Sequence, residues 1–150
     1  MKSSAIFDST GYRLARAAKD HRGRLARCLA PVGLYLGQEL LLATLWQENG
    51  LTQSQLSKQL GIGAPTVTKI VKGLEHIGLI ARARDTKDAR VSRVWLTERG
   101  VALQPEIERC WLEAEARMVR ALNKQEEGAL RSLLEKTAET DILTDIDLSF

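Results

Sequence analysis

The 150-residue sequence contains no long apolar run. A membrane-spanning helix needs about 20 consecutive apolar residues, whereas the longest candidate, Leu40 to Trp46, has the length of a buried helical segment. The N-terminus also lacks the apolar segment of a secretory signal. We therefore expect no membrane span, and the cytoplasm is the expected compartment.

Cysteines, histidines and catalytic motifs are scarce as well. Cys28 and Cys110 are too few, and too far apart in the sequence, to indicate a disulfide scaffold. No two residues among these cysteines, His21 and His76 have the spacing of a metal-ligand pair. The chain has no nucleophile motif and no phosphate-binding loop, and its carboxylates are scattered or in the acidic tail. We expect no metal, no cofactor and no enzymatic activity.

The charged residues are unevenly distributed, which is more informative than the net charge of +3. Residues 1–30 carry seven Lys/Arg against two Asp/Glu, and residues 64–100 carry eight against four. Residues 123–150 have the opposite balance, three against seven. Basic segments favour a polyanion as the partner, although a charged segment is often only a solvated face. The length suits one domain with helical extensions.

Apolar residues recur at helical spacing in the first third of the chain. From Leu14 onward they predict a long first helix that ends before Pro31. Gln38 to Gln47 forms a second, strongly apolar helix, which Asn49-Gly50 stops.

Two shorter helices follow. Thr52 opens the third, and Gln55 completes a T-x-x-Q capping box. Residues 61–63 make a Gly-Ile-Gly turn, and Pro65 begins a fourth helix that runs to about Ile77.

The remaining pattern predicts a hairpin and two more helices. The strands are residues 79–84 and 91–96, and the polar residues 85–90 form the hairpin tip. Thr97 caps a long fifth helix, and Asn123 opens a sixth with another capping box. The fold class is mainly α with a small β-hairpin, in the order α-α-α-α-β-β-α-α.

Residues 52–97 contain the most specific pattern. Two short helices joined by a Gly-containing turn form a helix-turn-helix motif. Position 57 must be small because the second helix crosses close above it, and Ser57 stands where Ala is usual. Gly61 lets the chain reverse at positive φ, while Val67 and Ile70 pack the second helix onto the first.

Four polar residues remain on the outer face of the fourth helix once its apolar positions are assigned to the core. A helix in the major groove presents its N-terminal residues to base edges and its flanks to phosphates. The alternative is a solvated helix face. The predicted contacts of this recognition helix are Thr66, Thr68, Lys69 and Lys72.

The hairpin carries a cluster of basic residues directly after the helix-turn-helix. Such a hairpin is the wing of a winged helix, and an arginine at its tip can enter the minor groove. Asp88 is placed to orient the guanidinium of Arg90 through a bidentate pair. The predicted wing contacts are Arg84, Lys87, Asp88 and Arg90, and the basic cluster also includes Arg82 and Arg93.

From about residue 10 to residue 140 the sequence resembles the MarR (multiple antibiotic resistance regulator) family. The resemblance implies a homodimer, a recognition helix at 65–77 and an Arg90-bearing wing. It also implies a sequence-specific transcriptional repressor that small aromatic ligands or oxidants control. The most specific segments are Leu51-Thr-Gln-Ser-Gln-Leu, Thr66-Val-Thr-Lys-Ile-Val, Leu74-Glu-His-Ile-Gly-Leu-Ile, Asp85-Thr-Lys-Asp-Ala-Arg90 and Val94-Trp-Leu-Thr-Glu-Arg-Gly100.

The outer helices favour dimerisation independently of the resemblance. They are long and amphipathic, and Trp111, Met118 and Leu122 exceed what one small core needs. A symmetric dimer places two recognition helices on half-sites ~10 bp apart, which predicts a pseudo-palindromic operator in double-stranded DNA. The alternative is that these helices complete a monomer core. We assign residues 35–100 to a winged helix-turn-helix domain, and residues 8–30 and 101–145 to a dimerisation region.

In the resembled family, a ligand pocket lies between the dimerisation helices and the DNA-binding unit. Four residues of this sequence are able to stack on, or hydrogen-bond to, an aromatic acid. Each is also an ordinary core or interface residue. The candidate ligand-binding residues are His21, Tyr35, Trp46 and Trp111.

Two further functions stay open. One is a redox-sensing repressor that uses Cys28, since Arg24 and Arg27 lie nearby in sequence and positive charge favours a thiolate. Against it, a cysteine on an apolar stripe is usually a core residue, and redox-sensing members of the family keep their reactive cysteine nearer the start of the first helix. The other is a winged-helix protein-interaction module that does not bind DNA, which does not need Lys69, Lys72 or Arg90.

Overall fold

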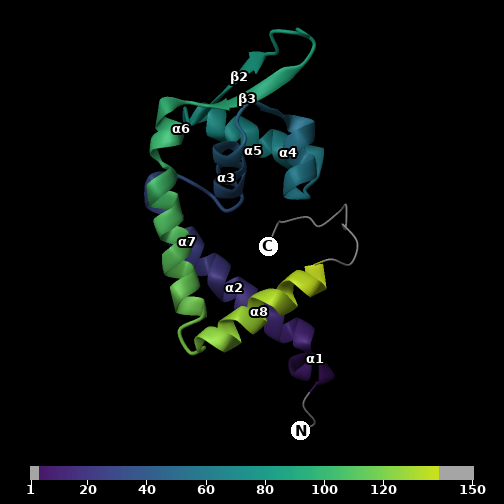
Figure 1. Ribbon diagram of the computed structural model, residues 1–150, viewed down its shortest axis with the longest axis vertical. Helices are drawn as coiled ribbons and strands as arrows, with labels where there is room; N and C mark the ends of the chain where they lie inside the picture. The colour runs from purple at the N-terminus through teal and green to yellow at the C-terminus, as the bar shows by residue number, and fades with distance from the viewer. Residues whose placement is uncertain (1–3, 139–150) are drawn as a thin grey trace.

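The computed structural model describes residues 4–138, so the end of the predicted dimerisation region, 139–145, lies outside the described residues. The molecule is elongated, with the wing at one end and the N-terminal helices at the other (Figure 1). Within residues 4–138, no helix combines the length and the apolar character that crossing a membrane requires. In chain order the elements are α1 (Ala5–Asp8), α2 (Thr10–Leu29), the 3-10 turn η1 (Ala30–Val32), α3 (Gln38–Gln47), β1 (Leu51–Thr52), α4 (Gln53–Leu60), α5 (Ala64–His76), β2 (Ile80–Arg84), β3 (Ser92–Leu96), α6 (Glu98–Ala102), α7 (Gln104–Met118) and α8 (Lys124–Ala138).

The predicted fold class, mainly α with a small β-hairpin, is confirmed, and the hairpin is part of a small antiparallel sheet. Both predicted capping boxes are present: Thr52 and Gln55 exchange side-chain bonds with each other's backbone N–H at 3.2 and 2.9 Å. Asn123 and Glu126 do the same at 2.9 Å each. Each box satisfies two backbone donors that have no partner within the helix.

The predicted long fifth helix is divided into α6 and α7, which corrects the expectation of one unbroken helix. Pro105 stands in the first turn of α7 and has no N–H to donate to the Val101 carbonyl. Leu103 lies between the two helices in an αR conformation, so the chain continues in the same direction. The short helix α1 was not predicted.

The sheet has a third strand that the sequence pattern did not reveal. Its order is β1-β3-β2, with Leu51 opposite Val94 and Arg84 opposite Ser92. A two-residue strand is too short to show alternation of polar and apolar residues. β1 leads directly into α4, so it anchors the helix-turn-helix to the wing.

The core lies where α3 meets α4, α5, the sheet and α7. Leu41, Leu42 and Leu45 of α3 are at most 1% exposed. Figure 1 shows α3, α4 and α5 packed together beneath the sheet, while α2, α7 and α8 extend away from them. We call α3, α4, α5 and the sheet the reading head of the protein. The helices α1, α2, α7 and α8 form its stem.

A disulfide joins the stem helices α2 and α7, which contradicts the expectation drawn from the spacing of the cysteines. The Sγ atoms of Cys28 and Cys110 are 2.13 Å apart, and their Cα atoms 5.6 Å. Disulfides require Cα atoms within about 4.4–6.8 Å and set no limit on sequence separation, here 82 residues. The two helices pack side by side, and this brings the cysteines together.

Candidate nucleic-acid interface

The turn between α4 and α5 is built as the helix-turn-helix spacing predicts. Gly61 adopts φ +64°, in the left-handed region that an L side chain rarely enters. Ser57 is partly buried, and its hydroxyl donates to the Ile62 carbonyl at 2.6 Å. Serine in place of alanine at this position therefore adds a hydrogen bond that closes the turn.

The helix α5 has one buried and one exposed face. Val67, Val71 and Leu74 are fully buried. Lys69 and Lys72 are exposed, and within residues 4–138 neither forms an ion pair with a carboxylate. Their charges are available to an external anion.

Thr66 and Thr68, the other two predicted contacts on α5, are partly exposed and differ in their bonding. The Thr68 hydroxyl lies 3.0 Å from the Ala64 carbonyl and 3.0 Å from Gln53 Oε1. It therefore connects α5 to the first residue of α4. The structure thus brings the Gln53 side-chain amide next to α5.

At the wing tip, Arg90 and Asp88 form the bidentate pair that the sequence suggested. Nε and Nη2 of Arg90 donate to the two Asp88 carboxylate oxygens at 3.1 and 3.3 Å. The backbone N–H of Arg90 donates to Asp88 Oδ1 at 3.0 Å. These bonds from the side chain and then the backbone of Arg90 lower the pKa of Asp88 below its ordinary value. The Arg90 side chain is nevertheless 91% exposed. Arg84 and Lys87 are exposed residues as well.

Two members of the basic cluster serve the fold. Arg82 donates three hydrogen bonds to the Glu75 carboxylate, the shortest 2.8 Å, and this contact lowers the pKa of Glu75 and raises that of Arg82. Arg93 donates to the Gly50 carbonyl at 2.9 Å and lies 3.5 Å from an Asp85 carboxylate oxygen. Apart from Arg82, whose guanidinium is held by Glu75, the exposed basic residues of the wing are Arg84, Lys87 and Arg90.

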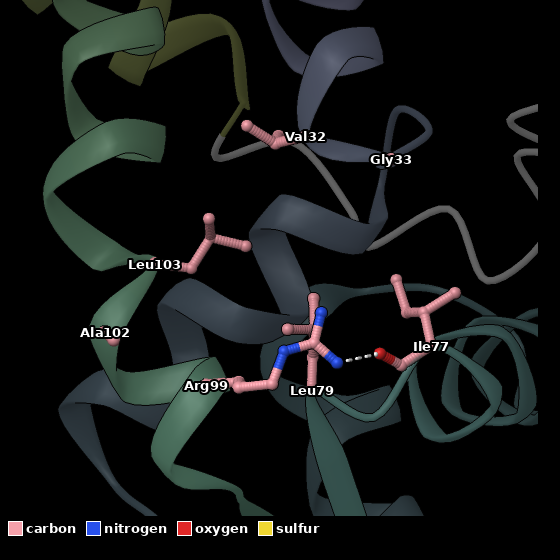
Figure 2. A pocket seen from close by; sticks show the side chains of 7 residues that line it. All are labelled: Val32, Gly33, Ile77, Leu79, Arg99, Ala102 and Leu103. Carbon is pink, nitrogen blue, oxygen red and sulfur yellow. Dashed lines mark hydrogen bonds between the residues drawn. The ribbon is translucent and has the colours of Figure 1, made fainter.

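The C-terminus of α5 is capped from α6. Arg99 donates to the Ile77 carbonyl at 3.0 Å, the bond drawn in Figure 2. Both residues line a hollow of about 410 Å³ between the end of α5 and α6. A cation at this position interacts favourably with the helix dipole. None of the four predicted ligand-binding residues lines this hollow.

The predicted ligand-binding residues divide into two groups. Trp46 and Trp111 line one hollow of about 550 Å³ between α3 and α7, and the ring of His21 lies 5.3 Å from that of Trp111. Tyr35 is 79% exposed and borders a different hollow, with Arg22. The structure does not bring Tyr35 to the other three.

Comparison with known proteins agrees with this geometry. The family model described as MarR family matches residues 34–92. The chain is 29% identical over 126 residues to the HTH-type transcriptional repressor Rv2887 of Mycobacterium tuberculosis (strain ATCC 25618 / H37Rv), covering 84% of this chain and 91% of that protein.

Solved structures agree over nearly the whole chain. A probable transcriptional regulator from Pseudomonas aeruginosa superposes with a TM-score of 0.81 at 28% identity, covering 88% of this chain and 98% of that one. The transcriptional repressor CouR, bound to a 23-mer DNA duplex, gives a TM-score of 0.83 at 29% identity over 92% and 98%. The chain thus matches the MarR family model over residues 34–92, and over most of its length it is similar to transcriptional regulators and repressors with the same fold.

Proposed function

We propose that this chain is a homodimeric repressor that binds an operator in duplex DNA with α5 and the wing. The observation that carries the proposal is the contact of Arg82 with Glu75, which ties β2 to the C-terminal half of α5. The recognition helix and the wing therefore form one unit. A protein-interaction module has no need for a basic helix face held at a set distance from a basic hairpin tip.

In this proposal the N-terminal turns of α5 enter the major groove. Thr66 and Lys69 face base edges, because helices docked in this way present their N-terminal residues to the bases. Lys72 lies further along the helix and contacts phosphate. Thr68, whose hydroxyl is engaged with Gln53, positions the N-terminus of α4 and the Gln53 amide against the backbone of the duplex.

The wing reaches the neighbouring minor groove. Arg90 is exposed, and Asp88 holds its side chain in one orientation. Its binding in the groove therefore costs little side-chain conformational entropy. Arg84, at the end of β2, and Lys87, within the tip, contact phosphates.

Dimerisation uses the stem. Large apolar side chains are exposed on helices that lie away from the reading head, and an apolar face of this kind is usually covered in the functional protein. In this proposal a second copy of the chain packs against the apolar face. A dimer with two reading heads on one duplex binds more tightly than a single reading head does. The exposed side chains are Ile6, Phe7, Leu14, Leu112, Met118, Leu133 and Leu134.

A small aromatic acid is the effector that the Trp46–Trp111 hollow suits best. Trp46 Nε1 donates to the Gly100 carbonyl at 3.0 Å, so a ligand against this ring acts on α6 and, through it, on β3. His21 Nδ1 is buried and has no hydrogen-bond partner among the described residues. Salicylate is a direct probe, and it should change the tryptophan fluorescence of the wild type in a saturable manner. The change should be smaller in Trp111→Leu and the same as in the wild type in Tyr35→Phe. An unsaturable response in the wild type contradicts this site.

Selection of a preferred site from random duplex DNA tests the main proposal. Binding to the selected duplex should fall about 10³-fold or more between roughly 50 and 200 mM salt, since each phosphate contact releases counterions. A scrambled duplex of equal length is the control and should bind more weakly. Failure to enrich any sequence, or binding that does not depend on salt, contradicts the proposal and favours a protein-interaction module.

A further inference from the structure

The disulfide between Cys28 and Cys110 lies in a hollow at the surface rather than beneath it. The hollow has a volume of about 430 Å³, and both cysteines line it. Cys110 is fully buried, whereas Cys28 is partly exposed. An incoming sulfur therefore reaches Cys28 first, and Cys110 stands behind it.

The wall of this hollow is mainly cationic. It includes Arg24 and Arg27 from α2 and Arg117 from α7. None of the three forms an ion pair with a carboxylate in the described part of the chain. The one acidic group, Glu113, lies 3.8 Å from Cys28 Sγ and is itself paired with Arg109 at 2.6 Å. Unpaired guanidinium groups around a sulfur attract anions and favour a thiolate when the bond is reduced.

We infer that Cys28 and Cys110 form a reversible thiol–disulfide exchange site whose arginine wall selects negatively charged low-molecular-weight disulfides. The inference rests on the proposed function in one respect: a protein that acts on DNA works among reduced thiols, where disulfides are usually transient or redox-sensing. A purely structural bond needs neither a partly exposed sulfur nor unpaired arginines beside it.

The exchange proceeds in two steps. In the reduced protein, the Cys28 thiolate attacks one sulfur of the small disulfide, whose S–S bond breaks and releases one small thiolate. Cys28 is then in mixed disulfide with the other half. The Cys110 sulfur attacks Cys28, forms the bond seen in the structure, and expels the second small thiolate. The protein loses two electrons and two protons, and the two released thiols gain them.

Glutathione redox buffers test the first part. The full-length chain is equilibrated at ratios from reducing to oxidising, alkylated, and weighed by mass spectrometry. We expect a complete and reversible transition between dithiol and disulfide. In Cys110→Ala, which keeps a small apolar side chain at a buried position, the product should remain a mixed disulfide with glutathione at Cys28. A folded wild-type chain that stays oxidised at the most reducing ratio, or a Cys110→Ala variant that collects no mixed disulfide, overturns the inference.

Exchange rates test the arginine wall. Removing two charges in Arg27→Gln/Arg117→Gln should slow oxidation by anionic glutathione disulfide about five-fold and speed oxidation by dicationic cystamine by a similar factor. Neutral 2-hydroxyethyl disulfide reports the change in the thiolate fraction of Cys28 alone, so both of these factors are taken relative to its rate. Arg16→Gln/Arg120→Gln, with the same change in charge outside the hollow, is the matched control. If the oxidation rates change equally in both double variants, or equally with all three disulfides, the proposed selectivity is wrong.

Duplex binding is measured separately on the reduced and the oxidised chain. Absence of duplex binding in both forms contradicts the proposed function and leaves the exchange chemistry standing. Absence of exchange in a chain that binds duplex DNA contradicts only the inference drawn here.

Discussion

Arg90 and Asp88 are two residues apart and form three hydrogen bonds of 3.0 to 3.3 Å at the tip of the wing. This arrangement places a carboxylate on a surface that we propose faces DNA. Simple electrostatics makes that carboxylate repulsive to DNA, while the geometry makes it a support that orients the arginine. The two effects predict opposite signs.

We expect Arg90→Ala to weaken specific duplex binding by about 1–3 kcal/mol, the loss of one groove contact. Asp88→Ala should also weaken binding, because the guanidinium loses its fixed orientation. Titrations at two salt concentrations measure both. Melting temperatures should barely change, since exposed substitutions usually alter stability by about 0.5 kcal/mol or less. Tighter binding by Asp88→Ala removes the orienting role, and unchanged binding by Arg90→Ala removes the wing from the interface.

The same pair predicts a titration. The pKa of Asp88 lies below the ordinary 3.8 because Arg90 bonds to the ionised carboxylate. The pair is therefore intact above pH 3.8 and is lost as the pH falls through the lower, folded-state pKa. Carboxyl chemical shifts followed by NMR should give a midpoint below 3.8 in the wild type and a higher one in Arg90→Gln. Identical midpoints in the two proteins mean that the pair does not persist in solution.

Lys69 and Lys72 should respond differently to substitution, although both are exposed on α5. Lys72→Ala should weaken all duplexes about equally and reduce the salt slope by roughly one, as the loss of a phosphate contact does. Lys69→Ala should relax specificity at one operator position. Selections repeated with each variant supply the comparison. Altered sequence preference with an unchanged salt slope in Lys72→Ala reverses these assignments.

Gly100 should not tolerate a side chain. A Cβ atom there overlaps the Leu79 carbonyl oxygen, which the N–H of Thr97 holds at 3.0 Å. We expect Gly100→Ala to lower the free energy of unfolding by about 1–3 kcal/mol. Gly128→Ala is the matched control: nothing lies within 4 Å of its Cβ position in α8, so it should stabilise by up to about 1 kcal/mol. Equal effects in chemical denaturation refute the packing argument.

The apolar stem predicts a dimer at micromolar concentration. Sedimentation equilibrium should give about twice the chain mass of 16.7 kDa. Leu133→Glu, at a side chain 59% exposed, should shift the chain toward monomer, because burying a carboxylate in an apolar interface is unfavourable. Leu133→Met keeps the apolar character and should remain dimeric. A wild-type chain that sediments as a monomer contradicts the assignment of a second copy to this face.

The sequence by itself determined much of the local structure. Capping at Thr52 and Asn123, the positive φ of Gly61 and the amphipathic spacing of α5 all depend on residues a few positions apart, and short-range rules describe them. The position of the wing and the Asp88–Arg90 pair followed from the same local reasoning. This part of the candidate interface was therefore predictable from the sequence.

Tertiary structure decided which of the predicted residues are available. Arg82 and Arg93 are engaged within the fold, Thr68 is bonded to Gln53, and Tyr35 lies apart from the other aromatic candidates. Spacing along the chain does not encode such contacts, because they depend on how separate elements pack. The bond between Cys28 and Cys110 has the same origin: α2 and α7 lie side by side although 82 residues separate the cysteines, and only packing brings the sulfurs together.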